Sequence, residues 1–317
     1  MICRQLFISF VLYLVASLSL QAGSTEIDWA NVKDRRWPGP AFWANRLQDW
    51  SIKDEQLQCA YEHGGGNWRT AHLLTHDLNS KGNRFELELE FVAASQGHVG
   101  VLLGAGEGKL NYTQASMIQG APGLGGGYLI DLAASAKRLC VRDFGSDDEV
   151  LVPQPMAHST LQSLPKPGTP LLLHIFGQRQ DEETFRLTVT LNAERQNLAT
   201  TRATVAADRL IGNVAIVSKG GIQQTPHRFS GLRISGERVS AHMERKYGPI
   251  GGVLYSVANG DLKVGVQCMS IGKTILPGEV FGKGSRVGVQ IEKRQADNSW
   301  AAATPPVGVS EPDYYAL

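Results

Sequence analysis

The stretch from Arg84 to Val92 constrains the fold of this chain more than any other, because its side chains alternate without a fault. On one side stand four large apolar residues, Phe85, Leu87, Leu89 and Phe91, and on the other stand three glutamates, Glu86, Glu88 and Glu90. Successive side chains of a strand point to opposite faces, so the pattern predicts a half-buried β-strand. Burying each apolar side chain contributes about 1.5–3 kcal/mol, and the four together can anchor a sheet.

Other short apolar or alternating segments recur along the chain, separated by turn residues. The predicted strands are 50–54, 56–61, 70–78, 84–92, 98–104, 128–132, 138–142, 171–177, 185–192, 212–218 and 228–236. The 35 glycines favour turns over helices. This pattern, without a convincing amphipathic helix, is typical of an all-β antiparallel sandwich. Residues 28–45 are expected to form an extended lead-in and 153–169 a connection, and 193–208 is left open for a helical turn.

A domain boundary is predicted near Val239, so the sandwich should span residues 23–238. Residues 239–317 contain three further predicted strands, 254–257, 261–268 and 286–293. This remainder is short for an immunoglobulin-like module, which takes ~100 residues. We expect a small Ig-like β module that is incomplete, and we expect it to be loosely held.

The N-terminal residues 1–22 have the features of a secretory signal peptide. Arg4 supplies a positive charge, residues 6–20 are apolar apart from three serines, and Ala22 and Gly23 offer small side chains for cleavage. A membrane anchor is the alternative, but the apolar run is shorter than the ~20 residues that a span requires. The sequence therefore predicts a secreted or periplasmic protein with no membrane span after cleavage.

The charge balance excludes two classes of partner. The formal net charge is +1, and it falls to zero without Arg4. Nucleic-acid binding needs a basic face that neutralises phosphates, and electrostatic binding to anionic lipid needs a basic cluster. Neither a nucleic acid nor a lipid surface is expected as a partner.

Three cysteines remain after the signal segment, Cys59, Cys140 and Cys268. An oxidising compartment would allow one disulfide, most plausibly Cys59 with Cys140. Burial of all three as small apolar side chains is the favoured alternative, since a large core does not need a covalent link. Their pairing stays open from the sequence.

Two groups of polar residues on predicted strands could carry chemistry. Glu86, Glu88 and Glu90 repeat at ~6.6 Å along one strand face, a separation that acid/base pairs can have, but a solvated face opposite Arg or Lys explains them more simply.

His72 and His76 would be a metal pair on a helix, yet the Glu of the zinc-protease motif is missing. On a strand they should share a face, too far apart for one ion, and we expect structural or surface histidines.

Three loop features are weaker signals. The segment 120–127 is glycine-rich but lacks the residues of a phosphate-binding loop, so we expect a loop at the sandwich edge that could border a ligand site. The acidic side chains Asp143, Asp147, Asp148 and Glu149 could hold a structural calcium ion, although their spacing matches no EF-hand. Asn111 begins a glycosylation sequon.

No enzyme motif accompanies these features. The chain has no Gly-x-Ser-x-Gly elbow and no clustered Asp/His/Asn set of the kind that a two-metal phosphatase needs. The sequence therefore assigns no catalytic, cofactor-binding or metal-binding residue, and no cofactor apart from the calcium ion considered above.

Two parts of the chain resemble the N-terminal region of secreted alkaline phosphatase D-like (PhoD-like) proteins. They are 42–54 (FWANRLQDWSIKD) with 66–78 (GNWRTAHLLTHDL), and 244–250 (ERKYGPI) with 254–264 (LYSVANGDLKV). The resemblance implies a concanavalin/laminin-G-like jelly roll followed by an Ig-like module, with a metallophosphatase domain after both. The phosphatase motifs should lie after about residue 317, so no catalytic residue can be transferred. The jelly roll is also similar to 3-keto-disaccharide hydrolase-type proteins.

Three functions follow as expectations. The first is a secreted, non-catalytic binding or accessory region of a PhoD-like phosphohydrolase, in a truncated or stand-alone form, with a glycan or another extracellular ligand as its partner. The alternative is a glycan-binding or glycan-cleaving jelly-roll protein. The third is a split gene whose downstream frame carries the phosphatase.

Overall fold

The protein is described by a computed structural model. It describes residues 23–32, 34–44, 46–59, 68–106, 126–144, 154–220, 225–269, 288–308 and 315–316. Residues 1–22, the predicted signal peptide, lie outside the described residues.

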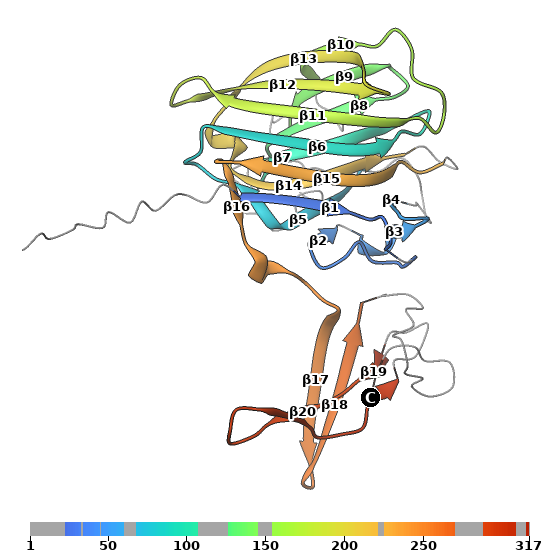
Figure 1. Ribbon diagram of the computed structural model, residues 1–317, viewed down its shortest axis with the longest axis vertical. Helices are drawn as coiled ribbons and strands as arrows, with labels where there is room; N and C mark the ends of the chain where they lie inside the picture. Colours follow the sequence, from blue (N-terminus) through green and yellow to red (C-terminus); the bar gives the residue numbers. More distant parts are fainter. Residues whose placement is uncertain are drawn as a thin grey trace, which may run out of the picture.

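Two antiparallel eight-stranded sheets form a β-sandwich, which confirms the predicted all-β class (Figure 1). Sheet A has the order β13 (Gln196–Ala206), β12 (Thr184–Ala193), β11 (Pro170–Arg179), β6 (Arg84–Val92), β15 (Arg228–Gly236), β4 (Gln56–Cys59) and β3 (Trp50–Lys53), with β1 (Gly23–Asp28) paired to β15. Sheet B has the order β10 (Pro155–Thr160), β9 (Arg138–Asp143), β8 (Tyr128–Ala133), β7 (His98–Ala105), β14 (Gly212–Lys219), β5 (Arg69–Leu78) and β16 (Val239–Ala241), with β2 (Phe42–Ala44) paired to β5.

The alternating strand β6 lies in the middle of sheet A, between β11 and β15. Its four apolar side chains are at most 1% exposed. Phe85 packs against Phe185 of β12 with ring centroids 6.4 Å apart, and Phe91 packs against Phe229 of β15 at 6.5 Å. The apolar side of this alternating strand thus faces the core between the two sheets.

Five strands of the sandwich lie where the sequence predicted none, namely β1, β2, β10, β13 and β16. β13 occupies most of the segment left open for a helical turn, and the turn is only the short 3₁₀ helix η2 (Asp208–Leu210). The inward residues of β13 include Ala199, Ala203 and Val205. Their side chains are too small to give the alternation of large apolar and polar residues that marks a strand. β10 alternates between half-buried and exposed positions at the edge of sheet B, so its burial pattern is weak. β1 begins at Gly23 and adds to sheet A by pairing with β15.

The segment just after residue 238 still belongs to the sandwich, since β16 pairs with β5. The 3₁₀ helix η3 (Met243–Arg245) then leads to the hairpin β17 (Ile250–Ala258) and β18 (Asp261–Cys268) (Figure 1). β23 (Tyr315–Ala316) pairs with β18. Two small sheets complete the described part, β19 (Gly288–Val289) with β22 (Val307–Gly308), and β20 (Glu292–Arg294) with β21 (Trp300–Ala302). Within the described ranges, no helix combines the length and apolarity needed to cross a bilayer.

Cys59 and Cys140 lie in different sheets and no disulfide joins them. Cys59 is in the core of sheet A. Cys140 is fully buried on β9, where it alternates with the core residues Leu139 and Val141. The disulfide considered from the sequence is therefore wrong, and Cys268 is half-buried rather than buried.

Candidate functional site

The outer face of sheet A is a polar surface on which the glutamates of β6 have charged neighbours. Arg233 of β15 donates from Nη1 to Glu88 Oε2 at 2.9 Å and from Nη2 to Glu26 Oε1 at 2.7 Å. His174 of β11 lies with Nε2 2.5 Å from Glu86 Oε1. The sequence-based interpretation of a solvated face opposite a basic residue is confirmed, although Arg233 and His174 were not foreseen.

The outer face of sheet B is different, because polar and apolar side chains are buried there together. Strand register places three rows of residues on it. They are Arg138, Ala133, His98 and Lys219 in the first row, Cys140, Asp131, Gly100, Val217 and Thr70 in the second, and Arg142, Leu129, Leu102, Ala215 and His72 in the third. Five apolar members of this face form a cluster with Trp68 and Ala105 that is separate from the main core. They are Leu102, Leu129, Ala215, Val217 and Phe144.

Asp131 is the centre of the polar group on this face. Its side chain is 0% exposed, its Oδ2 lies 2.6 Å from His98 Nδ1, and its Oδ1 accepts a hydrogen bond from Arg142 Nε at 2.7 Å. His98 and Arg142 belong to the rows on either side, so each reaches Asp131 diagonally. Gly100 of β7 lies directly opposite Asp131, and a Cβ at Gly100 would meet the carbonyl oxygen of Ile130 at 2.0 Å.

Trp68 closes one side of this group. Its ring centroid lies 5.0 Å from that of His98, and the Lys219 ammonium lies 5.1 Å from the indole centroid. Burial lowers the pKa of Lys219 below its ordinary value. On the other side, burial raises the pKa of the Cys140 thiol to about 11, so this cysteine is a neutral thiol at physiological pH.

The Asp131 carboxylate orients two side chains, the imidazole of His98 and the guanidinium of Arg142. Because the Asp131 carboxylate accepts from His98 Nδ1–H, the Nε2 edge of the ring is left for other contacts. The His98 side chain is 18% exposed, which gives solvent limited access to it. Asp131 acts as a positioning residue, since both its oxygens already have partners within the protein.

None of these residues was assigned from the sequence. Asp131 is a carboxylate within the otherwise apolar run 128–132, and a charged residue in a buried strand is the signal that could have identified it. His98 and Arg142 carry no comparable signal, because only the pairing of β7, β8 and β9 brings them to Asp131.

The structure separates His72 from His76. His72 lies in the third row on the outer face of sheet B, while His76 has a hydrogen bond with the backbone of Ser24 in β1. The register between β5 and β14 shifts between these positions, so the expectation that both histidines share one face is wrong. Burial first, and His242 second, lower the pKa of His76.

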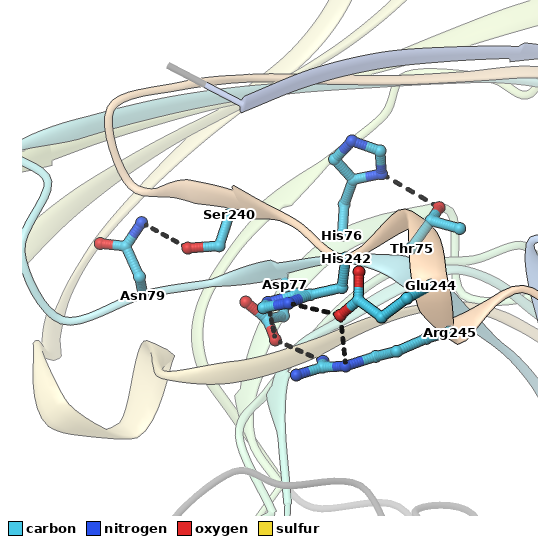
Figure 2. Close-up of polar contacts among 8 residues, drawn as sticks. All are labelled: Thr75, His76, Asp77, Asn79, Ser240, His242, Glu244 and Arg245. Carbon is cyan, nitrogen blue, oxygen red and sulfur yellow. Dashed lines mark hydrogen bonds and ion pairs between the residues drawn. The ribbon is translucent and has the colours of Figure 1, made fainter. Parts of the chain in front are cut away.

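His76 belongs to a polar junction between β5 and the segment that follows β16 (Figure 2). Asp77 Oδ2 lies 3.1 Å from His242 Nε2 and 3.0 Å from Arg245 Nη1. His76 Nδ1 is 3.0 Å from Thr75 Oγ1. Through these contacts Asp77 holds η3 against the sandwich. The polar side chains of the junction are therefore partners of one another, and their presence needs no ligand.

The acidic loop considered for calcium is described only at Asp143. Its carboxylate receives two hydrogen bonds from Arg209, Nη1 to Oδ2 at 2.5 Å and Nη2 to Oδ1 at 2.6 Å. Asp147, Asp148 and Glu149 lie outside the described residues, as do Asn111 and residues 120–125 of the glycine-rich segment.

No protein-family model matches the chain, and no curated protein matches it. Among solved structures, a lectin from Bauhinia forficata in complex with GalNAc is similar over 69% of this chain and 99% of its own, with 11% identity and a TM-score of 0.45. The VIP36 exoplasmic/lumenal domain, in a Ca²⁺/Man3GlcNAc-bound form, is similar over 62% of this chain and 86% of its own, with 9% identity and a TM-score of 0.40. The Emp46p carbohydrate recognition domain covers 67% of this chain and 87% of its own, with 11% identity and a TM-score of 0.36.

Proposed function

We propose that this protein is a secreted glycan-binding sandwich protein, and that its binding site is the outer face of sheet B around His98. The observation that carries the proposal is the buried Asp131 carboxylate, which holds His98 and Arg142 in place beside Trp68. Sugar hydroxyls are donors and acceptors at fixed positions, so they are recognised by polar groups that are already oriented before binding.

Binding is favoured over cleavage by the chemistry of this face. Glycoside hydrolysis by the common route needs two carboxyl groups on either side of the scissile bond. The three rows of described residues contain one carboxylate, Asp131, and its two oxygens are bonded to His98 and Arg142. Such a carboxylate can orient its neighbours, but it is not placed to act as an acid or a nucleophile.

The charge of the face selects among glycans. Arg138, Arg142 and Lys219 supply three positive charges in the described rows, against the single negative charge of Asp131. Cations in partly buried positions attract anionic groups more strongly than exposed ones do. We therefore expect oligosaccharides that carry carboxylate or sulfate groups to bind more tightly than neutral ones.

The test is calorimetric titration of the mature protein with neutral gluco- and manno-oligosaccharides and with uronate-containing and sulfated oligosaccharides. His98→Gln and Lys219→Gln should each weaken binding at least about tenfold, as expected for a central contact in a desolvated site. Lys53→Gln on β3 of the opposite sheet provides the matched control, because Lys53 is an exposed lysine far from the outer face of sheet B, and this variant should bind as the unaltered protein does. Absence of binding to every oligosaccharide, or equal affinity in all three variants, would overturn the proposal.

An accessory role beside a PhoD-like phosphatase is the second candidate, and one structural relationship favours it. The two sequence regions that carry the resemblance meet at one junction. Tyr247 packs edge-on against Trp43 with ring centroids 5.1 Å apart, and its backbone N–H donates to the Pro40 carbonyl at 2.9 Å. Arg245 adds the ion pair with Asp77. A junction of this kind would hold the sandwich in a defined orientation to whatever follows it.

The nucleotide sequence after the codon for Leu317 tests this second candidate. A metallophosphatase domain in the same or an adjacent frame supports the accessory role. An unrelated gene, together with no phosphatase activity from a co-transcribed partner, counts against it.

A further inference from the structure

One group of side chains on the outer face of sheet A is not used by the proposed glycan site. Glu86, Glu88 and His174 each bring one ligand atom to within 4.8 Å of the others. Two of them, Glu86 and Glu88, come from β6, and His174 comes from the neighbouring strand β11.

Strand geometry explains why these three atoms converge. Glu86 and Glu88 stand on the same face at a ~6.6 Å repeat. His174 lies directly opposite Glu88 in the register of β6 with β11, yet its Nε2 is 2.5 Å from Glu86 Oε1. The imidazole therefore leans along the strand and reaches both carboxylates.

The support beneath this group is rigid. Between and beside the two glutamates, Phe85, Leu87 and Leu89 are at most 1% exposed in the core. Ile175, next to His174, is 0% exposed. The backbone that carries the three ligands is therefore held by the packed sheet, so binding an ion does not have to order it.

The surroundings favour a cation. A hollow of about 260 Å³ adjoins Glu88, and Glu26, Asp28 and Glu90 contribute further carboxylates to its lining. Its described lining contains one basic residue, Arg233. Carboxylates outnumber cations here by four to one, so the local potential attracts positive ions.

We propose that Glu86, Glu88 and His174 form a binding site for a divalent transition-metal ion of the zinc type. Imidazole nitrogen combined with carboxylate oxygen suits zinc, whereas calcium and magnesium prefer oxygen ligands alone. Three protein ligands leave one position of a tetrahedral ion for water or for an external ligand. The site is independent of the glycan site, because it lies on the opposite sheet.

Arg233 limits the affinity of this site. Its Nη1 donates to Glu88 Oε2 at 2.9 Å, and a metal ion at Glu88 would feel repulsion from the guanidinium. Removing that charge should tighten metal binding, whereas removing a ligand should weaken it. The two opposite directions distinguish a metal site from a general acidic patch.

The experiment is a titration of tag-free, metal-stripped mature protein with Zn²⁺ by calorimetry, with Ca²⁺ as the comparison ion and Co²⁺ absorption as the probe of coordination. We expect one Zn²⁺ per chain, bound more tightly than Ca²⁺, and a visible Co²⁺ band. His174→Gln and Glu86→Gln should each weaken Zn²⁺ binding at least about tenfold and abolish the Co²⁺ band. Arg233→Gln should tighten Zn²⁺ binding.

Two matched controls come from this chain. Glu90→Gln alters the same strand and face outside the three ligands, and His158→Gln removes an exposed histidine on another strand. His158→Gln should retain the Zn²⁺ affinity of the unaltered protein, and Glu90→Gln, which removes one charge from the hollow but no ligand, should lower the affinity far less than Glu86→Gln does. Equal loss in Glu90→Gln and Glu86→Gln, unchanged binding in His174→Gln, or no binding at all would overturn the proposal. Thermal unfolding of each variant shows whether any loss comes from misfolding.

Discussion

The Nδ1 atom of His227 accepts a hydrogen bond from the backbone N–H of Ala94 at 3.0 Å, and its Nε2 lies 3.3 Å from the carbonyl oxygen of Lys219. The side chain is fully buried. This geometry requires the neutral ring with its proton on Nε2, since a protonated Nδ1 could not accept from Ala94. Burial lowers the pKa of His227 to about 4.

A pH dependence of stability follows from His227. In the unfolded chain a histidine has its ordinary pKa near 6.5, so between about pH 6.5 and pH 4 the unfolded state binds a proton that the folded state does not. The free energy of unfolding should therefore fall as the pH decreases through this window, by about 3 kcal/mol in total. Urea unfolding at several pH values measures it. In His227→Gln this component should be missing, while His158→Gln should keep it.

Substitution of Asp131 by Asn is expected to destabilise the sandwich by about 3 kcal/mol or more. The change removes the buried carboxylate that accepts from Arg142 Nε at 2.7 Å, and breaking a buried ion pair costs about 3–5 kcal/mol. Asp181→Asn is the comparison, because Asp181 bonds within an exposed turn. Chemical denaturation of both variants measures the difference. Equal stabilities of the two would show that Asp131 does not organise the outer face of sheet B.

Gly177→Ala is expected to cost about 1–3 kcal/mol by overpacking. Gly177 lies opposite Phe85 on β6, and an added Cβ would meet the ring at 2.1 Å. The ring is 1% exposed and cannot move away without disturbing its neighbours. Gly252→Ala in β17 is the control, since nothing lies within 4 Å of its added Cβ. A shift of the unfolding midpoint in Gly252→Ala as large as that in Gly177→Ala would contradict this account.

Amide exchange should be rapid in the hairpin β17–β18 and slow in β6. Tyr255 and Val257 are 76% and 68% exposed, and Leu262, opposite Val257, is 58% exposed, so few buried contacts oppose local opening. Hydrogen exchange followed by mass spectrometry compares the two regions in one experiment. Uniform protection across both regions would show that the exposed apolar side chains of the hairpin β17–β18 are covered in solution.

Much of the sheet content could be predicted because alternation is a local property. β6 and β12 each alternate large apolar residues with polar ones, and both are strands as predicted. β13 could not be predicted in this way, since its inward Ala199 and Ala203 have little apolar surface, and its place as an edge strand beside β12 comes from pairing. Here the tertiary contacts override a weak local preference.

The polar groups show the same division. The glutamates of β6 were identified from their spacing, but Arg233 is 145 residues away from Glu88 along the chain. Likewise His98 precedes Asp131 by 33 residues, and Arg142 follows it by 11. These residues are brought together by strand pairing, and the spacing of residues along the sequence does not predict which strands pair.

The sequence by itself determined the period of the side chains, and with it the all-β class and the apolar face of each well-patterned strand. The tertiary structure alone decided which strands became neighbours, and so which charged residues met. The physical reason is that alternation follows from the backbone geometry of one strand, whereas strand order follows from how the whole chain buries its apolar surface. Asp131 shows both effects, since its place in a strand is local and its two partners are not.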